Sequence, residues 1–403
     1  MLRFISNRIR KGQKGSFSAT VSMITVTSVA FGMVVLILSV FILEGFKANV
    51  LTQLFSAEGH IKVSSYDANT YSEESPIKQS SEFYHHATEI DGLSHIQSFA
   101  NKSGLIKTES AVEGVLVKGV GVDFNRSIFE KNIQKGTFLN VNDSNYVKEI
   151  VLSETIATKL KLSVGDDLYL FFIQDKPKER KLKVVGIYNT FIGEFDSKVV
   201  LCDIKMIQKL NHWSDTLIGG YDVFLTNLDH LPKVSEAVYD QMDYDLQLEK
   251  ITARFPHIFD WLTLLNKNVV VFVIIIFVIA AFNMLSTMYI LMMERANMIG
   301  MFKAMGAMPI LIRKVFWYYG LSLGFKGIVI GNVIALLLCA VQYYFRLFPL
   351  DPESYYMDAV PILWDWSAWV MINVLVSVLI ALIVFFPTYL ITRMNALKVI
   401  KFD

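Results

Sequence analysis

Four intervals of the chain are long, apolar and almost free of charged side chains. A membrane-spanning helix needs about 20 apolar residues, because a helix rises about 1.5 Å per residue across roughly 30 Å of hydrocarbon. The intervals 15–43, 268–293 and 367–392 contain no Asp, Glu, Lys or Arg, and 315–345 contains only Lys326. Core helices of soluble proteins seldom stay uncharged over such lengths. The pattern therefore predicts four transmembrane helices.

The first of these intervals also has one feature of a secretory signal, because basic residues precede it. Its apolar part is longer than the core of a signal peptide, and no A-x-A-like cleavage site follows it. We therefore interpret it as a retained helix.

Basic residues are distributed unevenly among the short polar segments. The N-terminal tail, residues 294–314 and the C-terminal tail together hold 12 basic and 2 acidic residues, whereas residues 346–365 hold Arg346 and four acidic residues. Under the positive-inside rule, both termini and the middle segment are predicted to be cytoplasmic. Four spans satisfy that arrangement.

The long segment between the first and second spans, residues 44–267, is then external. It holds 24 basic and 31 acidic residues and is long enough for a core of its own. Its pattern predicts an α+β domain, in two lobes. The strand-like runs are Gly59–Ser64, Ser110–Val122, Glu149–Leu152, Asp167–Ile173, Arg180–Tyr188, Val199–Asp203 and Tyr221–Leu225, and the helical runs are Ser153–Lys161, Ile204–Leu210 and Leu231–Asp243.

The fold class expected from these patterns is an α-helical membrane protein with four transmembrane helices and a large α+β extracytoplasmic domain between helices 1 and 2. The expected boundaries are a basic tail at 1–17, helix 1 at 18–43, the external domain at 44–267, helix 2 at 268–293, a cytoplasmic helix at 294–314, helix 3 at 315–345, a short external loop at 346–365, helix 4 at 366–392 and a cytoplasmic tail at 393–403.

Composition and charge agree with a membrane protein and give no sign of a nucleic-acid partner. The 403 residues are 53% hydrophobic and 19% charged, with a mean hydropathy of +0.42. The formal net charge is +1, so no basic excess indicates a nucleic-acid partner. Cys202 and Cys339 lie far apart and on different sides of the predicted membrane boundary, which excludes a disulfide framework and a zinc site.

Residues typical of catalysis or metal binding are scattered. The adjacent pair His85 and His86 would point to different faces of a regular element, and no HExxH motif accompanies it. The sequence contains no G-x-S-x-G elbow and no G-x-x-x-x-G-K-[ST] phosphate loop. We expect no catalytic residue, no metal site and no bound cofactor in this chain.

The third span carries a stripe of small residues. Gly320, Gly324, Gly327 and Gly331 fall on one face of a helix, which lets another helix approach closely. Lys326 lies away from that stripe. It either extends along the helix toward the cytoplasmic surface or lines an internal cavity.

The segment 294–316, ERANMIGMFKAMGAMPILIRKVF, combines a helical period with a methionine-rich face. Met298, Met301, Phe302 and Met305 follow the i, i+3, i+4, i+7 spacing, and Glu294, Arg295 and Lys303 are the polar complement. Such a helix either lies on the lipid surface or inserts its apolar side chains into a groove of a soluble partner.

This segment resembles the coupling-helix motif of the FtsX/MacB superfamily of ABC-transporter permeases, E-R-x-x-x-I-G-x-x-[KR]-A-x-G-A. Pro387, Arg393 and Ala396 are similar to the closing motif of the same family. The coupling matches are Glu294, Arg295, Ile299, Gly300, Lys303, Ala304, Gly306 and Ala307.

Within the superfamily, the chain resembles the lipoprotein-releasing permeases of the LolC/LolE type, over nearly its whole length. It departs from their pattern at Ser153, Ile156 and Phe191. The matching residues are Gly45, Phe46, His60, Leu160, Leu162, Gly165, Asp166, Gly186, Phe195, Asp196 and Ser197.

The resemblance implies a multi-pass permease of the bacterial inner membrane that moves lipoproteins from the membrane to a periplasmic carrier. The implied partners are a cytoplasmic ABC ATPase dimer, which binds ATP and Mg²⁺, and a second permease copy or paralogue. It also places the hairpin around Lys176–Arg180 near a carrier-docking hook. The alternative is mechanotransmission, as in efflux or activation of an extracytoplasmic partner. The implied ATPase-coupling residues are Glu294, Arg295, Met298, Ile299, Gly300, Met301, Phe302, Lys303, Met305 and Gly306.

Overall fold

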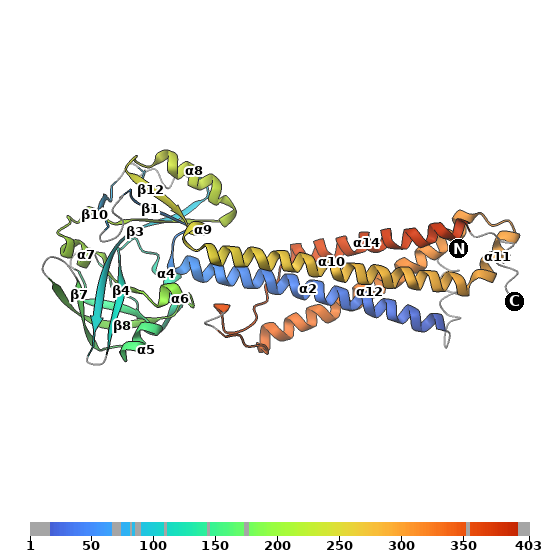
Figure 1. The fold of residues 1–403 in the computed structure, drawn as a ribbon, viewed down its shortest axis with the longest axis horizontal. Coiled ribbons are helices and arrows are strands. Elements are labelled where there is room, and N and C mark those ends of the chain that lie inside the picture. Colours follow the sequence, from blue (N-terminus) through green and yellow to red (C-terminus); the bar gives the residue numbers. More distant parts are fainter. Residues whose placement is uncertain are drawn as a thin grey trace. The chain divides into compact units, whose positions relative to one another are not determined.

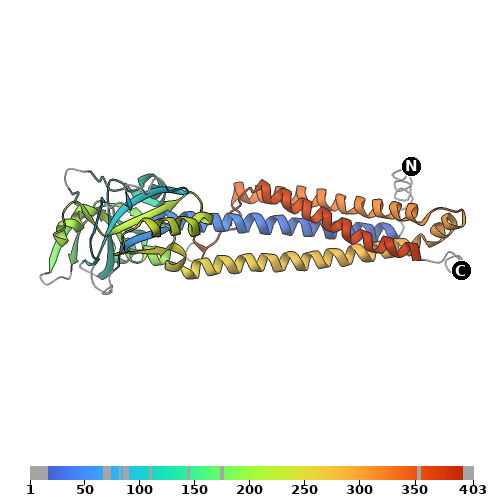
Figure 2. The ribbon, with the colours of Figure 1, turned by 90° about the horizontal axis from the view of Figure 1, so that it is seen from above.

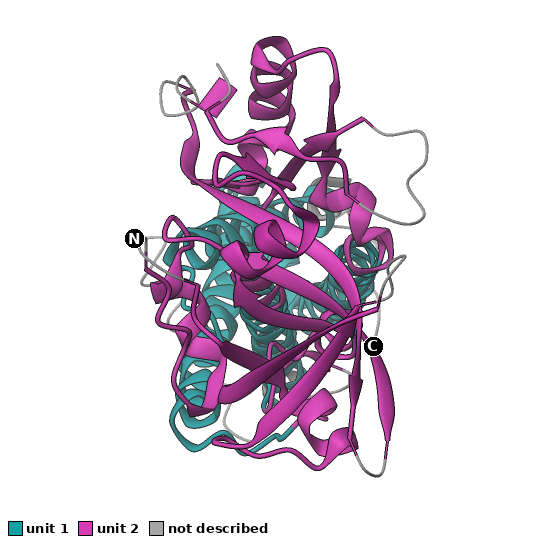
Figure 3. Ribbon diagram, turned by 90° about the vertical axis from the view of Figure 1, so that its left-hand side faces the viewer, with its two compact units in different colours: residues 1–48, 261–349, 359–403 teal, residues 49–260, 350–358 magenta. Residues whose placement is uncertain are grey.

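The structure is a computed structural model that describes residues 17–66, 74–80, 83–84, 90–108, 111–142, 146–172, 177–351 and 355–393. Its chain forms two compact units, coloured separately in Figure 3. Unit 1 comprises residues 1–48, 261–349 and 359–403, and unit 2 comprises residues 49–260 and 350–358. The boundaries at 48/49 and 260/261 fall within two long helices, and those at 349/350 and 358/359 lie outside helices.

Unit 1 is helical. Its elements are α2 (Phe17–Ala57) and α10 (Pro256–Glu294), which both continue into unit 2, and α11 (Ala296–Ala304), α12 (Pro309–Phe345) and α14 (Trp366–Arg393).

Unit 2 combines strands with short helices. Its elements are β1 (Ile61–Ser65), β2 (Ile77–Lys78), β3 (Leu93–Lys107), β4 (Val112–Val120), α4 (Arg126–Phe129), η2 (Glu130–Asn132), β5 (Ile133–Gly136), β6 (Glu149–Ser153), α5 (Glu154–Leu160), β7 (Asp167–Phe172), β8 (Lys178–Tyr188), α6 (Gly193–Asp196), β9 (Val199–Asp203), α7 (Ile204–Asn211), β10 (Leu217–Ile218), β11 (Gly220–Leu225), η3 (Leu228–His230), α8 (Leu231–Gln241), β12 (Leu246–Lys250) and α9 (Ile251–Arg254).

Four helices of the described chain are long and apolar enough to cross a membrane, which confirms the predicted number of spans. They are α2, α10, α12 and α14, and they lie side by side in both Figure 1 and Figure 2. Helix α2 continues past the expected end of its span at Leu43 to Ala57, and α10 begins at Pro256, before Asn268. A span is limited by bilayer thickness, whereas a helix continues as long as its backbone hydrogen bonds are satisfied.

The directions of the helices follow from their contacts. Along α12, Gly327 approaches Val29 and Gly331 approaches Met33, so α12 runs parallel to α2. Helix α14 runs antiparallel to α12, because successive contacts of α12 lie at decreasing positions of α14, and hydrogen bonds show the same relation between α10 and α2. The first residues of α2 therefore lie at the same end of the bundle as α11 and the last residues of α14.

The glycines of α12 face two different helices. A Cβ added to Gly324 would lie 2.5 Å from Ile380 Cγ2 of α14, and one added to Gly331 would lie 2.7 Å from the carbonyl oxygen of Ala30 in α2. Gly320 faces α14 and Gly327 faces α2 in the same way. Because α12 crosses its neighbours at an angle, the glycines in the first half of the stripe contact α14 and those in the second half contact α2.

Hydroxyl groups in the first half of α2 join it to two other helices. Ser22 and Tyr319 of α12 share a hydrogen bond of 3.0 Å, and the Asn283 amide of α10 donates to the Ser28 hydroxyl at 2.7 Å. Thr25 and Thr287 are also hydrogen-bonded to each other. Since hydrocarbon offers no water, such contacts are how polar side chains between helices are satisfied.

A second polar group lies farther along α12. The indole of Trp369 donates to Asn332 Oδ1 at 2.7 Å, and the Asn332 amide donates to Asn373 Oδ1 at 2.8 Å. This group joins α12 to α14 and fixes their axial register, since a shift of either helix would leave buried amides unsatisfied.

The sheet of unit 2 runs in the order β12-β1-β11-β3-β4-β9-β6-β8-β5, and β7 pairs with both β3 and β8. Parallel pairing occurs between β4 and β9 and between β6 and β8. The expected α+β class is confirmed for this domain. The sequence pattern did not predict β3 and β12 as strands, because polar side chains such as Ser98, Asn101 and Lys102 interrupt the apolar alternation of β3.

The expected division of the external domain into two lobes stays a prediction. Strand β3 links the two halves of the sheet. Residues 93–99 of β3 pair with β11, and residues 99–107 pair with β4, with 105–107 also pairing with β7. A single long strand thus belongs to both halves of the sheet. Because β7 pairs with both β3 and β8, the strands β3, β4, β9, β6, β8 and β7 form a closed ring of pairings.

His60 is buried between the end of α2 and the sheet. Its ring stacks on Phe55 with centroids 3.7 Å apart, and its Nδ1 accepts a hydrogen bond from the Leu225 amide at 3.3 Å. Burial lowers the pKa of His60 from 6.5 to about 4. The ring is therefore neutral at neutral pH, and its Nδ1 is an acceptor.

Replacing Gly331 by alanine tests the close packing of α12. The added Cβ would lie 2.6 Å from Met33 Cβ and 2.7 Å from the Ala30 carbonyl oxygen, so we expect a loss of roughly 1–3 kcal/mol and a lower unfolding temperature in detergent. Gly193→Ala is the control, because a Cβ there meets nothing within 4 Å. Equal unfolding temperatures for Gly331→Ala and the unchanged protein would contradict the packing described.

The buried state of His60 predicts a pH dependence of stability. The pKa of His60 is lower in the folded protein than in the unfolded protein. Its contribution to the free energy of unfolding is therefore complete above pH 6.5 and is lost as the pH falls toward about 4. The full effect is on the order of 3 kcal/mol. Other groups titrate in this range, so we compare pH-dependent unfolding with His60→Asn, whose Oδ1 replaces Nδ1 as acceptor. The wild-type curve should be the steeper of the two, and parallel curves would argue against the assignment.

Candidate functional site

Helix α11 forms a short elbow between α10 and α12, and its C-terminal end has a specific local cause. Gly306 has φ of +82°, a conformation that favours glycine. Its amide donates to the Lys303 carbonyl at 3.0 Å, and the Ala307 amide donates to the Phe302 carbonyl at 2.9 Å. This pair of bonds is a Schellman motif, which ends the helix and turns the chain toward Pro309 at the start of α12.

Three methionines form an exposed row on the elbow. Met301 is 59% exposed, Met305 is 72% exposed and Met308 is 68% exposed. Met301 and Met305 are four residues apart, which places them one helical turn from each other, and Met308 follows the Gly306 turn as the N-cap of α12. Methionine is flexible and polarizable, so such a row suits binding to an apolar groove of a protein partner.

The remaining apolar side chains of the elbow point inward. Ile299 is 1% exposed, and Met298 and Phe302 are half-buried. The predicted stripe of Met298, Met301, Phe302 and Met305 is thus divided between two faces. Met298, Ile299 and Phe302 line an apolar recess of about 50 Å³, together with Ala307, Leu311, Ile312, Val315 and Phe316.

This division follows from the length of α11. A helix of nine residues packed on α12 uses about half of its circumference for that contact, so only the outer positions remain exposed. Met308, which lies after the helix, completes the outer row. The sequence-based interpretation did not include it among the coupling residues, because Met308 follows the turn at Gly306, where helical spacing no longer tells which side a residue faces.

Two basic side chains lie on the elbow, one at each end of α11. Arg295 occupies the N-cap position of α11, and Lys303 lies in its last turn, where a positive charge is favourable at the C-terminal end of a helix. Glu294 is the last residue of α10, and Gly300 is buried beside Ile299.

The first turns of α12 are held against α14 by a cation–π contact. The Arg313 guanidinium lies 4.1 Å from the ring centre of Phe385 and 5.6 Å from that of Tyr389. Positive-inside counting treats Arg313 only as a charge, so this packing role is visible only in the structure. The elbow is continuous in sequence with α10 and α12, and Arg313 joins α12 to α14.

The described parts of the chain contain no group of three or more His, Cys, Asp or Glu residues that could hold a metal ion. His85 and His86 lie outside the described residues, as does Lys176 of the expected hook. Strands β7 and β8 pair antiparallel from Asp167 with Lys183 to Phe172 with Lys178, so the expected hairpin is present up to its undescribed tip.

The described residues define a multi-pass membrane protein with an α+β domain inserted after its first helix. Residues 22–238 match the MacB-like periplasmic core domain, and residues 270–396 match the FtsX-like permease C-terminal domain. The chain belongs to the FtsX/MacB superfamily of ABC-transporter permeases, as its coupling motif indicated.

Curated relatives cover nearly the whole chain. The lipoprotein-releasing system transmembrane protein LolE of Haemophilus influenzae is 21% identical over 99% of this chain and 98% of its own length. The LolC protein of Neisseria meningitidis is 20% identical over 82% of this chain and 80% of its own. Among solved structures, the extracellular domain of the noncanonic ABC-type transporter YknZ from Gram-positive bacteria covers 47% of this chain and 99% of its own, at 13% identity and a TM-score of 0.33.

The predicted orientation can be tested at the exposed row. We expect an impermeant maleimide to label Met305→Cys in inside-out vesicles and not in spheroplasts, because the positive-inside rule places the elbow in the cytoplasm. Both native cysteines are buried, at 1% and 0% exposure, so background labelling should be low. Labelling in spheroplasts alone would reverse the orientation.

Proposed function

We propose that this chain is the permease subunit of an ATP-driven transporter of the lipoprotein-releasing type. The observation that supports this most strongly is the full-length similarity to LolE, combined with an exposed methionine row on a coupling-motif elbow. In this proposal the elbow is cytoplasmic and docks on a separate ABC ATPase dimer, which binds ATP and Mg²⁺. This chain supplies the membrane path and the external domain.

The proposed docking contact is the insertion of Met301, Met305 and Met308 into an apolar groove of the ATPase. Basic Arg295 and Lys303 flank this row on the same short helix. Complementary acids on the ATPase would set orientation, while the methionines supply most of the buried apolar area.

The contacts within unit 1 give the route by which a push on the elbow spreads. The recess joins α11 to the first turns of α12, and Arg313 joins α12 to α14. Hydroxyl contacts near Ser22 and Thr25 then join α2 to α12 and α10. All four membrane helices are thus linked within the half of the bundle that carries the elbow.

A second permease copy or a paralogue is the proposed partner within the membrane. Along α10, Val271, Ile275, Val278 and Phe282 are each about half exposed or more, at 53%, 48%, 59% and 70%. Helix α10 therefore presents a long apolar surface that either a second subunit or an acyl chain can cover. The proposed cargo, a lipoprotein bound for a periplasmic carrier, rests on the named function of the relatives.

The coupling role predicts a specific loss in Met305→Asp. A carboxylate in an apolar groove loses its hydration, so we expect the variant permease to bind the ATPase at least about 100-fold more weakly than the wild type does. The complex reconstituted with this variant should lose stimulated ATP hydrolysis. The variant should still insert and fold, because Met305 is 72% exposed in this chain.

Met305→Leu is the matched control and should keep most of the stimulation, since it retains apolar area. Full stimulation in Met305→Asp would remove the coupling role. Release of a labelled lipoprotein from proteoliposomes separates the two transport classes: coupled hydrolysis without release would favour the mechanotransmission alternative.

A further inference from the structure

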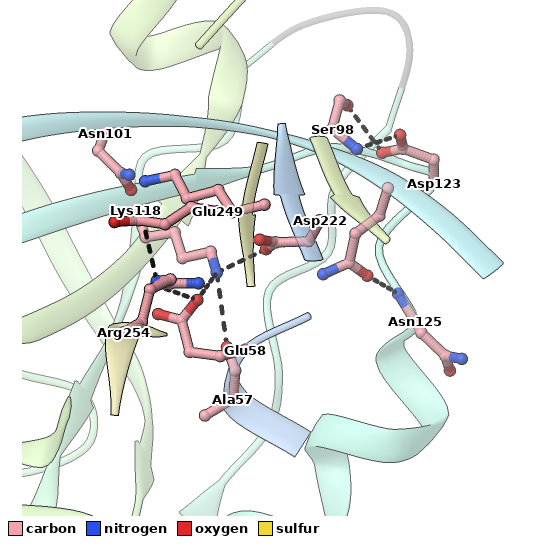
Figure 4. A network of polar contacts seen from close by, with 12 residues as sticks. Ala57, Glu58, Ser98, Asn101, Lys118, Asp123, Asn125, Asp222, Glu249 and Arg254 are labelled. Carbon is pink, nitrogen blue, oxygen red and sulfur yellow. Dashed lines mark hydrogen bonds and ion pairs between the residues drawn. The ribbon is translucent and has the colours of Figure 1, made fainter. Parts of the chain in front are cut away.

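Four charged side chains are buried together inside unit 2 (Figure 4). They come from four separate elements: Glu58 follows the last residue of α2, Lys118 lies on β4, Asp222 lies on β11 and Arg254 ends α9. Their side chains are 11%, 5%, 1% and 15% exposed, respectively. We call these four residues the charge cluster.

The charge cluster is connected by short ion pairs. Lys118 Nζ lies 2.8 Å from Asp222 Oδ2 and 3.6 Å from Glu58 Oε2, and Arg254 Nη2 donates to Glu58 Oε2 at 2.8 Å. Lys118 Nζ also donates to the carbonyl of Ala57, the last residue of α2, at 3.5 Å. At its edge, Arg254 Nε lies 3.8 Å from the more exposed Glu249.

The cluster is balanced in charge, which allows it to stay ionised while buried. Burial alone would raise the pKa of Glu58, but the nearby Lys118 and Arg254 lower it to about 2. The carboxylates of Asp222 and Glu58 in turn keep Lys118 protonated, since they raise its pKa despite burial. Every member therefore depends on the position of the others.

Two polar atoms of the cluster have no hydrogen-bond partner among the described residues, Asp222 Oδ1 and Arg254 Nη1. The cluster therefore leaves two buried polar atoms without a hydrogen bond. Apolar side chains of similar volume would stabilise this part of the core at least as well, since buried ion pairs are a poor source of stability. In this cluster the ion pairs constrain geometry, because moving any one partner would leave another charge buried and unpaired.

Uncharged contacts fix the same two helix ends. The Asn132 amide donates to Ser56 Oγ near the end of α2 at 2.7 Å, and the amide of Ile251, the first residue of α9, donates to the His60 carbonyl at 2.9 Å. Arg254 then lies two residues before the start of α10. The chain therefore enters and leaves unit 2 through segments that both end at the charge cluster.

We propose that the charge cluster is the joint that fixes the end of α2 and the α9 segment rigidly to the sheet, so that displacement of either helix moves unit 2 as a body. This inference rests on the proposed function, in which the helices transmit force from an ATPase. Glu58 is the central member, since it joins Lys118 of the sheet to Arg254 of α9. The cluster residues are positioning residues and touch no cargo.

The double variant Glu58→Gln and Arg254→Gln tests the joint. It removes one anion and one cation together and leaves the Lys118–Asp222 pair balanced. In the complex with the ATPase, we expect stimulated ATP hydrolysis to stay within about twofold, while lipoprotein release per ATP falls at least about tenfold. Amide hydrogen exchange in residues 50–57 and 251–254 should become at least about tenfold faster, with the sheet strands unchanged.

The matched control is Lys233→Met, because the Lys233–Asp91 pair is 73% and 91% exposed and lies in the same unit. We expect it to change neither exchange nor release. Equal release per ATP in the double variant and the wild type would overturn the proposal. Faster exchange throughout the sheet in double-variant protein that still folds would also overturn it, because the cluster would then be a general stabilising element.

If the double variant does not fold, the amide hydrogen exchange of the wild-type protein tests whether the charge cluster is a rigid joint. A joint requires residues 50–57 and 251–254 to open with the same free energy as β4 and β11, and earlier local opening would contradict it. A wild-type complex that hydrolyses ATP but releases no lipoprotein would refute the proposed function alone. In that case, hydrogen exchange would still test the rigid joint independently of the proposed function.

Discussion

Helix α12 contacts both α2 and α14 so closely that the approach depends on the absence of side chains. At Gly331 the nearest atoms include the Ala30 backbone, and at Gly324 they belong to the Ile380 side chain. Between helices in lipid there is no hydrophobic gain from leaving water, so dispersion contacts and interhelical hydrogen bonds must hold the bundle. Close approach at the glycines strengthens both, and it brings hydroxyl and amide groups within bonding distance.

The polar contacts of the bundle follow from this packing. The Asn332 group needs α12 and α14 in one register, and the bond between Ser22 and Tyr319 needs α2 beside the first half of α12. Each bond would be lost if the helices separated by a side-chain radius. The bundle is therefore suited to moving as a few rigid rods whose relative positions are discrete.

In the proposed path of force from the elbow to unit 2, helix ends are held in place by different interactions at the two ends. At the elbow, the Schellman motif at Gly306 and the recess behind Phe302 hold α11 on α12 by apolar packing. In unit 2, the charge cluster holds the end of α2 and the α9 segment to β4 and β11 by ion pairs. Apolar packing leaves an outer methionine row free for a partner, whereas buried charges specify one geometry and exchange partners only at high cost.

The sequence by itself determined the number of spans, the inserted α+β domain and the coupling motif, because these depend on local composition, on period and on residue identity at short spacing. Only the tertiary structure decided that Met298 and Phe302 face inward while Met308 joins the outer row, since that depends on which face of α11 packs on α12. It also decided that α12 divides its glycines between two helices. Glu58 and Arg254 are 196 positions apart, and no local pattern connects a glutamate at a helix end with a distant arginine. Their pairing required the sheet order that brings both to Lys118.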